Sequence, residues 1–444
     1  MFARLLALAL VLGLALPLHA KALTVIRDAE IERSLKEIAK PVLRAAGFGA
    51  NSIRLIVIRD NSLNAFVVDR RHVFLHSGLI RRLNSAEALQ AVIAHEVAHL
   101  ANGHLVRRAG NARVASRVAA IGLALSVAAA AKGEGQAALG IAAGTAGSAQ
   151  RVFFKHTRAE EASADQSALQ YMARAGIDPA AMSEVLELFR GQEALRPGRQ
   201  DPYARTHPLT ADRLRAVRGY AAAYKGKTRA TPAQTAYWFA RMNAKLDGFL
   251  SNPRTILRQK EAKGNSELAL LRRAVALHRR PDPKKALTAM NALLKLRPRD
   301  PYYHELRGQI LLEGGNAAPA VTSYRNAVTL GGNNALLLGG LGQALLAQNT
   351  RSSNAEALRV LSSARGRDPG DPSLLRNLAL AHARNGQNAL ASVATAERYL
   401  VIGRFKEAQL HGKRASGQLP RGSNGWLRAQ DVLATAKSAQ ARKR

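Results

Sequence analysis

The sequence predicts an α+β fold that is mostly helical, in which a domain with a short sheet precedes a solenoid of stacked helices. Short apolar runs typical of strands occupy Ile53–Ile58, Ala65–Val68 and His72–His76, with turn residues between them. From Glu267 onward, a pattern of small residues repeats after 34 residues and again after a three-residue insertion, which is typical of paired, stacked helices. A chain of 444 residues with 47% apolar content can fill two or three domain cores.

The first twenty residues have the layout of a signal peptide. Arg4 carries a positive charge ahead of an apolar run at Leu5–Leu16, and small residues follow at Ala20 and Ala22. An N-terminal anchor helix is the alternative, but about twelve apolar residues are too few to span ~30 Å of hydrocarbon. We therefore expect residues 1–20 to be a signal peptide, cleaved after Ala20 or after Ala22, and the mature protein to be periplasmic.

The composition excludes several classes of site and partner. The chain has no cysteine, which excludes disulfides, thiolate zinc sites and cysteine nucleophiles and suits an exported periplasmic protein. The net charge is +35, from 66 Lys and Arg residues against 31 Asp and Glu residues. We expect no nucleic-acid partner, because only 5% of the residues are aromatic, no nucleic-acid motif is present and the chain is exported. Two interpretations of the charge stay open: attraction to an anionic membrane or acidic client proteins, or a solvated basic surface that reflects an arginine-rich coding habit.

The elements of the first domain follow in order. Residues Ile31–Ala46 predict an amphipathic helix that Pro41 kinks or restarts. After the strands, Ser85 is an N-cap candidate for a helix that runs to about Asn102–Gly103, with Glu87 in its first turn. Later helical patterning covers 158–175, 180–189 and 211–224.

Two apolar segments interrupt this domain. Val118–Ala131 and Gln136–Gly147 are each too short to span a bilayer alone. They predict either packed helices or a hairpin that touches the membrane or covers a cleft. We place the domain boundaries at 22–224 for the first domain, 225–266 for a linker and 267–440 for the repeats.

The repeats share one pattern of small residues. Ala286, Leu293 and Pro298 lie at offsets 0, 7 and 12 of the first unit. The same offsets recur in three later units, at Ala320, Ala327 and Gly332, at Ala357, Ala364 and Pro369, and at Ala408, Ala415 and Pro420. The pattern resembles tetratricopeptide repeats, in which small residues let paired helices pack closely and stacked units form a concave protein-binding surface. The register between Pro372 and Ala408 stays ambiguous, and a generic helical bundle is the alternative.

The sharpest motif is HEVAH at His95–His99. Two histidines at i and i+4 stand on one face of a helix, so both imidazoles can reach one ion at about 2.0–2.1 Å. Glu96 lies about 100° round the helix from His95 and can accept a proton from water that zinc acidifies. Composition alone would give such a motif in roughly one chain in a hundred, but the apolar faces of this helix indicate a buried site. We therefore expect one zinc ion per chain, bound in part by His95 and His99.

A third ligand is needed, and two routes compete. In the extended histidine motif of zinc peptidases, the third ligand lies where this chain has Leu105, so that route fails. The acidic cluster at 160–165 offers a glutamate instead, because Glu161 and Asp165 share one helix face at i and i+4. Glu161 would bind zinc, and Asp165 would accept a hydrogen bond from a ligand histidine. Glu160 is a weaker alternative ligand, and a solvated acidic helix face is the competing interpretation.

These motifs resemble the family of zinc metallopeptidases that includes HtpX and the CAAX prenyl proteases, with a gluzincin-type domain. Beyond HExxH and the later ExxAD, the resemblance rests on Asn64–Phe66, His76–Ile80 and Ala175–Pro179. It covers about residues 22–224. It implies a zinc endopeptidase in which the strand at His72–His76 is the edge to which substrate backbone adds.

The signal peptide, the absence of apolar runs of membrane-spanning length and the repeats resemble a periplasmic subgroup of that family. The subgroup implies degradation of misassembled or stalled outer-membrane proteins and assistance to their assembly. Its repeats would bind clients or the outer-membrane barrel assembly machinery, peripheral to the outer membrane. Thr206–Pro208 followed by Arg213 also matches a subgroup motif, in which the histidine, here His207, lies near the zinc and can occupy its open position.

The resemblance therefore implies the metal ligands His95, His99 and Glu161, with catalytic roles for Glu96, Asp165 and His207. For Arg213 two roles stay open, because it would either stabilise an oxyanion or pair with an acidic neighbour. His104 and His156 are expected to support the site or to lie on the surface. The competing hypothesis is a periplasmic chaperone or adaptor that acts through its repeats, with a largely silent protease site.

Overall fold

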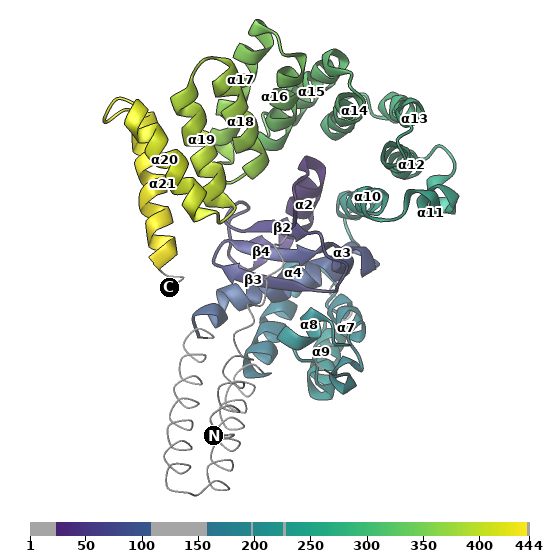
Figure 1. Cartoon of the computed structure of the whole chain (residues 1–444). Coiled ribbons are helices and arrows are strands. Elements are labelled where there is room, and N and C mark those ends of the chain that lie inside the picture. Colours follow the sequence, from purple (N-terminus) through teal and green to yellow (C-terminus); the bar gives the residue numbers. More distant parts are fainter. Residues whose placement is uncertain (1–23, 108–157, 197–198, 225–227, 442–444) are drawn as a thin grey trace, which may run out of the picture.

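The computed structural model of the chain describes residues 24–107, 158–196, 199–224 and 228–441 (Figure 1). The expected signal peptide and the two apolar segments between 118 and 147 lie outside these ranges. Within them, none of the helices combines the length and the apolar character that crossing a membrane requires.

A small mixed sheet forms the centre of the first domain. Its strands are β1 (Val25–Ile26), β2 (Arg54–Ile58), β3 (Ala65–Asp69) and β4 (His72–His76), in the order β1-β2-β4-β3. β2 and β4 run parallel, whereas β1 and β3 pair antiparallel with their neighbours.

The expectation that β4 is the edge strand was wrong. β4 pairs with β2 on one side and with β3 on the other, so both rows of its backbone hydrogen-bonding groups are used. The short turn after Asp69 folds β3 back along β4 as a hairpin, which leaves β3 at the edge. The alternating pattern of a strand identifies its buried face but does not show its position in the sheet.

Two helices pack against each other beside the sheet. α2 (Ala29–Ala45) continues through Pro41, and Asp28 caps its N-terminus by accepting bonds from two backbone N–H groups. α4 (Ala86–Ala101) begins after Ser85, whose hydroxyl caps the N–H of Ala88 as the sequence predicts. The short helix α3 (Ser77–Arg82) joins β4 to α4. The apolar side chains of α4 lie in the domain core, with Leu89, Val92, Ile93 and Val97 fully buried.

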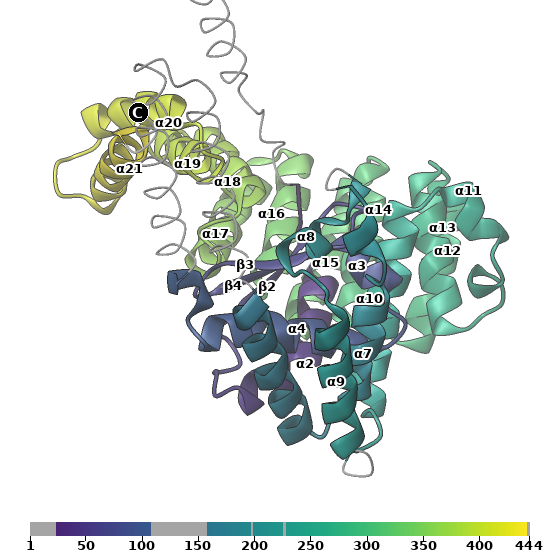
Figure 2. The same ribbon diagram turned by 90° about the horizontal axis from the view of Figure 1, so that it is seen from below.

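Further helices pack on α4 from the side away from the solenoid (Figure 2). Residues 158–175 are helical, and α7 (Ala180–Glu187), the 3₁₀ turn η1 (Gln192–Ala194), α8 (Pro202–Thr206) and α9 (Ala211–Ala223) follow. These helices bring residues distant in the sequence next to HEVAH.

The segment expected to be a linker contains α10 (Ala233–Leu250), α11 (Pro253–Arg258) and the 3₁₀ turn η3 (Lys260–Ala262). α10 packs against α2 on one side and against the first solenoid helix on the other. Its Arg241 and Lys245 side chains have no exposed surface. The exact boundaries at 224 and 267 remain a prediction.

Ten described helices form the solenoid, which curves around α2 (Figure 1). They are α12 (Glu267–Arg279), α13 (Pro283–Leu296), α14 (Pro301–Glu313), α15 (Ala317–Gly331), α16 (Ala335–Gln348), α17 (Arg351–Arg367), α18 (Pro372–Arg384), α19 (Asn388–Val401), α20 (Phe405–Gln418) and α21 (Asn424–Ala441). Asp-Pro pairs open α13, α14 and α18, because the aspartate caps free N–H groups and proline fits the first helical turn.

The small residues of the repeat lie at helix crossings. Ala286, Ala320 and Ala357 are fully buried, and a Cβ added at Gly308 would lie 2.8 Å from a ring carbon of Tyr324. The observed helix pairs thus confirm the tetratricopeptide-like solenoid. The ambiguous helix of the sequence pattern is α19, which packs against both α18 and α20.

Candidate metal centre

The two histidines of HEVAH converge on one point, as their spacing on α4 predicts. The Nε2 atoms of His95 and His99 lie 3.0 Å apart, and neither side chain is more than 1% exposed. Both residues follow the fully buried positions Val92 and Ile93, so the helix holds them against the domain core.

Glu161 reaches the same point from the helix at 158–175. Its carboxylate oxygens lie 3.2 Å from His95 Nε2 and 3.4 Å from His99 Nε2. Asn102, at the end of α4, donates to the hydroxyls of Ser163 and Ser167 at 3.0 and 3.1 Å, which fastens the two helices together. The structure therefore brings Glu161 to the histidines, as expected.

His207 supplies a fourth donor from the C-terminal end of α8. Its Nδ1 lies 3.0 Å from Glu161 Oε2 and 3.3 Å from His95 Nε2. Donor atoms of His95, His99, Glu161 and His207 all lie within 4.8 Å of one another, and all four residues are buried. Glu160 does not belong to this group of donors in the described part of the chain.

The outer nitrogens of the two HEVAH histidines also have partners. Asp165 Oδ1 lies 3.0 Å from His95 Nδ1, and His104 Nδ1 lies 2.8 Å from His99 Nδ1. Such contacts fix the orientation of an imidazole and leave its other nitrogen pointing at the shared point. His104 is 1% exposed and so lies against the site rather than on the surface, whereas His156 lies outside the described residues.

Arg213 supports the acidic side of the site. Its guanidinium binds both oxygens of Asp165, with Nη2 donating to Oδ1 at 2.9 Å, and Nη1 lies 3.2 Å from Glu161 Oε2. Nη1 also donates to the backbone oxygens of His207 and Pro208. Of the two roles left open for Arg213, the structure shows the acidic pairing.

Glu96 is poised next to the donors. Its side chain is fully buried, and neither carboxylate oxygen accepts a hydrogen bond within the described residues. Its Oε1 lies 3.5 Å from His207 Nε2. A buried carboxylate without a hydrogen bond is costly, so the arrangement indicates a partner that the described residues do not provide.

The close packing of the donors shifts the pKa values of His95, His99 and Glu161. Burial lowers the pKa of His95, but hydrogen bonds to Asp165 and Glu161 outweigh it and raise the value to about 9. Burial, together with the charges of His95 and His207, holds the pKa of His99 well below its usual range. Burial alone would raise the pKa of Glu161, yet the three histidines together hold it well below its usual range. Glu161 is therefore ionised, and zinc would displace the proton that the raised pKa places on His95, which leaves the carboxylate and imidazole donors that zinc prefers.

Sequence reasoning missed Tyr203. Its ring lies on that of His207, with centroids 4.5 Å apart, and packs on Phe189 at 4.7 Å. Its backbone N–H donates to Leu63 beside β3, which ties α8 to the sheet. Burial raises the pKa of the Tyr203 hydroxyl well above its usual value. The spacing of four residues between Tyr203 and His207 is the signal that could have linked them.

Comparison with known proteins agrees with this geometry. Residues 26–221 match the model of Peptidase family M48. The chain is 28% identical over 385 residues to the β-barrel assembly-enhancing protease of Escherichia coli strain K12, covering 84% of this chain and 77% of that protein. It is 27% identical over 191 residues to the mitochondrial metalloendopeptidase OMA1 of Schizosaccharomyces pombe, covering 41% and 51%.

Among solved structures, yeast Tom70 is similar with a TM-score of 0.32 and 13% identity, covering 83% of this chain and 82% of that one. The helix pairs themselves define the solenoid. The family match spans HEVAH, the glutamate helix and His207, and both relatives are proteases by name. Over residues 26–221 the chain is therefore similar to Peptidase family M48, and its metal centre has the donors of a metallopeptidase.

Proposed function

We propose that the chain is a zinc-dependent endopeptidase of the periplasm that degrades misassembled outer-membrane proteins and assists their assembly. The observation that carries the proposal is the buried group of four donors with the Glu96 carboxylate beside it. The likeness to β-barrel assembly-enhancing proteases over most of the chain supports the choice of clients.

His95, His99 and Glu161 would hold one zinc ion, with His207 as a fourth donor at rest. When bound, zinc supplies Lewis-acid polarisation of a peptide carbonyl and acidifies water toward a pKa of ~7. Glu96 accepts the proton from the attacking water and passes it to the leaving amine. Asp165 holds the His95 ring in place, and Arg213 holds Asp165.

The free edge of β3 supports binding of an extended client. β3 ends the described sheet and follows Asn64, whose backbone oxygen accepts from the N–H of His76. An added strand would be held by main-chain hydrogen bonds, which do not depend on the client's side chains. This kind of binding favours unfolded or stalled polypeptides over folded ones.

The inner face of the solenoid supports a second contact with clients or assembly machinery. A cavity of about 920 Å³ is lined by residues of β1, α2, α10 and the solenoid helices α12, α14, α15, α16 and α18. Its walls include the apolar side chains of Phe249, Leu312 and Leu374, together with Gly339, where an added Cβ would meet no other atom of the described residues within 4 Å.

The test is the variant Glu96→Gln, assayed on an unfolded outer-membrane protein. We expect cleavage to fall roughly 10²–10⁴-fold, because the proton acceptor is lost while the donors remain. Zinc content and the thermal unfolding midpoint should equal those of the wild type. A variant that cleaves as fast as the wild type would rule out this role for Glu96.

A chaperone or adaptor with a silent protease site is the second candidate, and the position of His207 favours it. Its Nδ1 already lies among the donors, so it could fill the position that a substrate needs. This candidate predicts that Glu96→Gln still suppresses aggregation of an unfolded outer-membrane protein, and that wild type and variant assist assembly equally. Loss of assembly activity in Glu96→Gln alone would favour the protease.

A further inference from the structure

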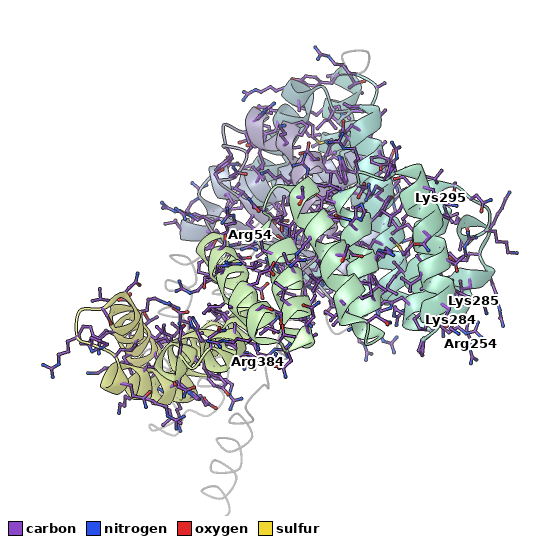
Figure 3. All side chains as sticks on the ribbon, turned by 90° about the horizontal axis from the view of Figure 1, so that it is seen from above. Arg54, Arg254, Lys284, Lys285, Lys295 and Arg384 are labelled. Carbon is purple, nitrogen blue, oxygen red and sulfur yellow. The ribbon has the colours of Figure 1, made fainter. Side chains whose placement is uncertain are left out.

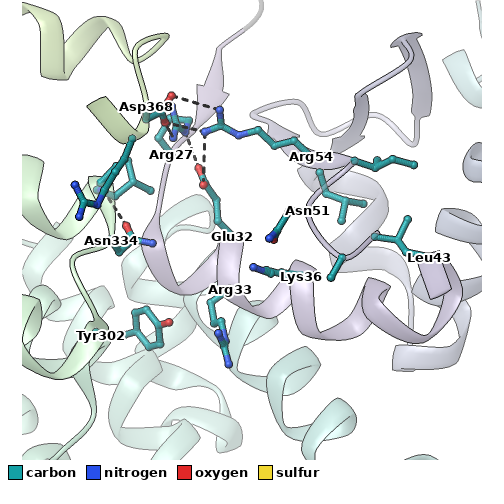
Figure 4. A pocket seen from close by; sticks show the side chains of 17 residues that line it. Arg27, Glu32, Arg33, Lys36, Leu43, Asn51, Arg54, Tyr302, Asn334 and Asp368 are labelled. Carbon is teal, nitrogen blue, oxygen red and sulfur yellow. Dashed lines mark hydrogen bonds and ion pairs between the residues drawn. The ribbon is translucent and has the colours of Figure 1, made fainter. Parts of the chain in front are cut away.

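A groove runs along the outer side of α2, where this helix meets the loops between repeats. It consists of two cavities of about 470 and 580 Å³ that share Arg33, Tyr302 and Gly331 as lining residues. Figure 4 shows the first cavity, with Lys36 pointing toward Asn51. We call it the cationic groove, after its lining residues Arg27, Arg33, Lys36, Arg54, Arg297, Arg299 and Arg367.

Part of this positive charge is neutralised inside the groove. Arg27 binds Glu32 at 2.6 Å, and Arg54 binds Asp368 at 2.8 Å, so the two acidic residues of the first cavity are already paired (Figure 4). Arg33 pairs with Glu37, one turn along α2. These contacts fasten α2 to the solenoid and leave no spare acidic group for the remaining cations.

Three cations of the groove lack an acidic partner among the described residues. They are Lys36 on α2, Arg299 in the loop before α14 and Arg367 at the end of α17, and all three are exposed. Three separate segments of the chain thus direct uncompensated positive charge at one groove. Scattered surface charge would not produce this convergence around a cavity.

α2 extends the positive charge beyond the cavities. Lys40 and Arg44 follow Lys36 at intervals of four residues, so they continue the same face of the helix. The groove also has an apolar side, formed by residues that include Leu55, Leu336 and the ring of Tyr302. A ligand that fits must combine negative charge with apolar or aromatic groups.

The occupant must come from another molecule. Within the parts of the chain that the structure does not describe, Glu134 is the single acidic residue, so these segments carry no acidic run. A second copy of the chain also carries a net charge of +35, so the two copies would repel each other. A flat bilayer cannot enter a groove between a helix and loops.

We propose that the cationic groove binds an acidic, extended segment of a partner polypeptide that carries apolar side chains between its carboxylates. The charge attracts such a segment from a distance, and the apolar wall holds it on contact. The groove lies apart from the metal centre, so this inference does not rest on the proposed protease function.

The test measures fluorescence anisotropy of a labelled peptide with alternating Asp or Glu and Leu or Phe residues, added to the full chain. The variant Lys36→Glu/Arg299→Glu/Arg367→Glu should bind this peptide at least about tenfold more weakly, because three attractions become repulsions. A peptide with Asn and Gln in place of the acidic residues should bind the wild type as weakly as the acidic peptide binds the triple variant. Thermal unfolding and cleavage of an unfolded protein should be unchanged in the variant.

The matched control is Arg254→Glu/Lys284→Glu/Lys295→Glu, which changes the net charge equally. These residues lie on the α11–α13 side of the solenoid, away from Arg54 (Figure 3), and none lines the groove. The control should bind the acidic peptide within about twofold of the wild type.

Three results would overturn the proposal. Equal losses in both triple variants would mean that overall charge, not the groove, attracts the peptide. Equal binding of the amide peptide would mean that the carboxylates are not recognised. Displacement of the peptide from the wild type by millimolar inorganic phosphate or by anionic phospholipid vesicles, at constant ionic strength, would make the groove a phosphate site instead.

Discussion

The molecule buries two groups of charged and polar side chains, one at the metal centre and one where α10 joins α2 to the solenoid. At the junction, Arg241 and Lys245 have no exposed surface, yet each pairs with several acids. Arg241 binds Glu30 at 2.6 Å and Asp300 at 2.5 Å. Lys245 binds Asp28 at 2.7 Å and lies 3.2 Å from Glu30.

The metal centre is assembled differently. Its donors point at one another, with His95 and His99 nitrogens 3.0 Å apart, and the Glu96 carboxylate accepts no hydrogen bond from the described residues. At the junction, each buried cation is paired with acidic side chains. At the metal centre, the imidazole nitrogens and the Glu161 carboxylate direct their donor atoms at one shared point. The comparison teaches that burial of charge does not by itself indicate function. Convergent donors with a carboxylate that no described residue satisfies do indicate it, because a cation and a substrate would complete them.

The largest expected effect concerns the junction. Lys245→Ala should lower the free energy of unfolding by about 3–5 kcal/mol, because Asp28 loses its cation and the buried Glu30 keeps only Arg241 among the described cations. Chemical denaturation followed by circular dichroism measures this. Lys285→Ala removes an exposed ion pair with Asp282 and should change stability by less than about 0.5 kcal/mol. Equal effects of the two variants would contradict a structural role for the junction.

The next effect concerns the residues around the donors. Asp165→Asn should lower zinc affinity or kcat/KM about 10–100-fold, because His95 loses its orienting carboxylate and Arg213 loses its partner. Zinc titration and initial rates on an unfolded protein measure it. Asp212→Asn, which removes an exposed pair with Arg215, is the control and should leave both values unchanged. If Asp165→Asn kept the zinc affinity and kcat/KM of the wild type, the contact between Asp165 and His95 would be incidental.

The smallest effect concerns His207. His207→Ala should raise the cleavage rate several-fold, by less than about tenfold, because the fourth donor no longer competes with substrate for the cation. Rates with saturating zinc separate this effect from any loss of metal. A fall in rate at full zinc occupancy would show instead that His207 assists the reaction.

Much of the fold was predictable because its signals are local. The Ser85 cap, the HEVAH helix and the 34-residue repeat depend on residues close in sequence, and the structure confirms each of them. The edge position of β4 was predicted wrongly, since strand order depends on which partners meet in space. The α10 junction was expected to be a linker because its buried cations read as surface charge when their partners at Glu30 and Asp300 lie far along the chain.

The candidate site was predictable to a similar degree. The i, i+4 spacing placed His95 and His99 together, and the same spacing placed Glu161 and Asp165 on one face. The two faces meet because the two helices pack together. Spacing alone does not show this contact, and its prediction came from the family resemblance. The stacking of Tyr203 on His207 could not be foreseen, because it depends on the path of the chain before α8.

The most direct test of the metal centre is elemental analysis of purified wild-type and Glu161→Ala protein. The wild type should hold one zinc per chain, and the variant should hold much less, because Glu161 contacts both HEVAH histidines and His207. Thermal unfolding of the zinc-free forms shows whether the variant still folds. Unchanged zinc in a folded variant would contradict the assigned ligands.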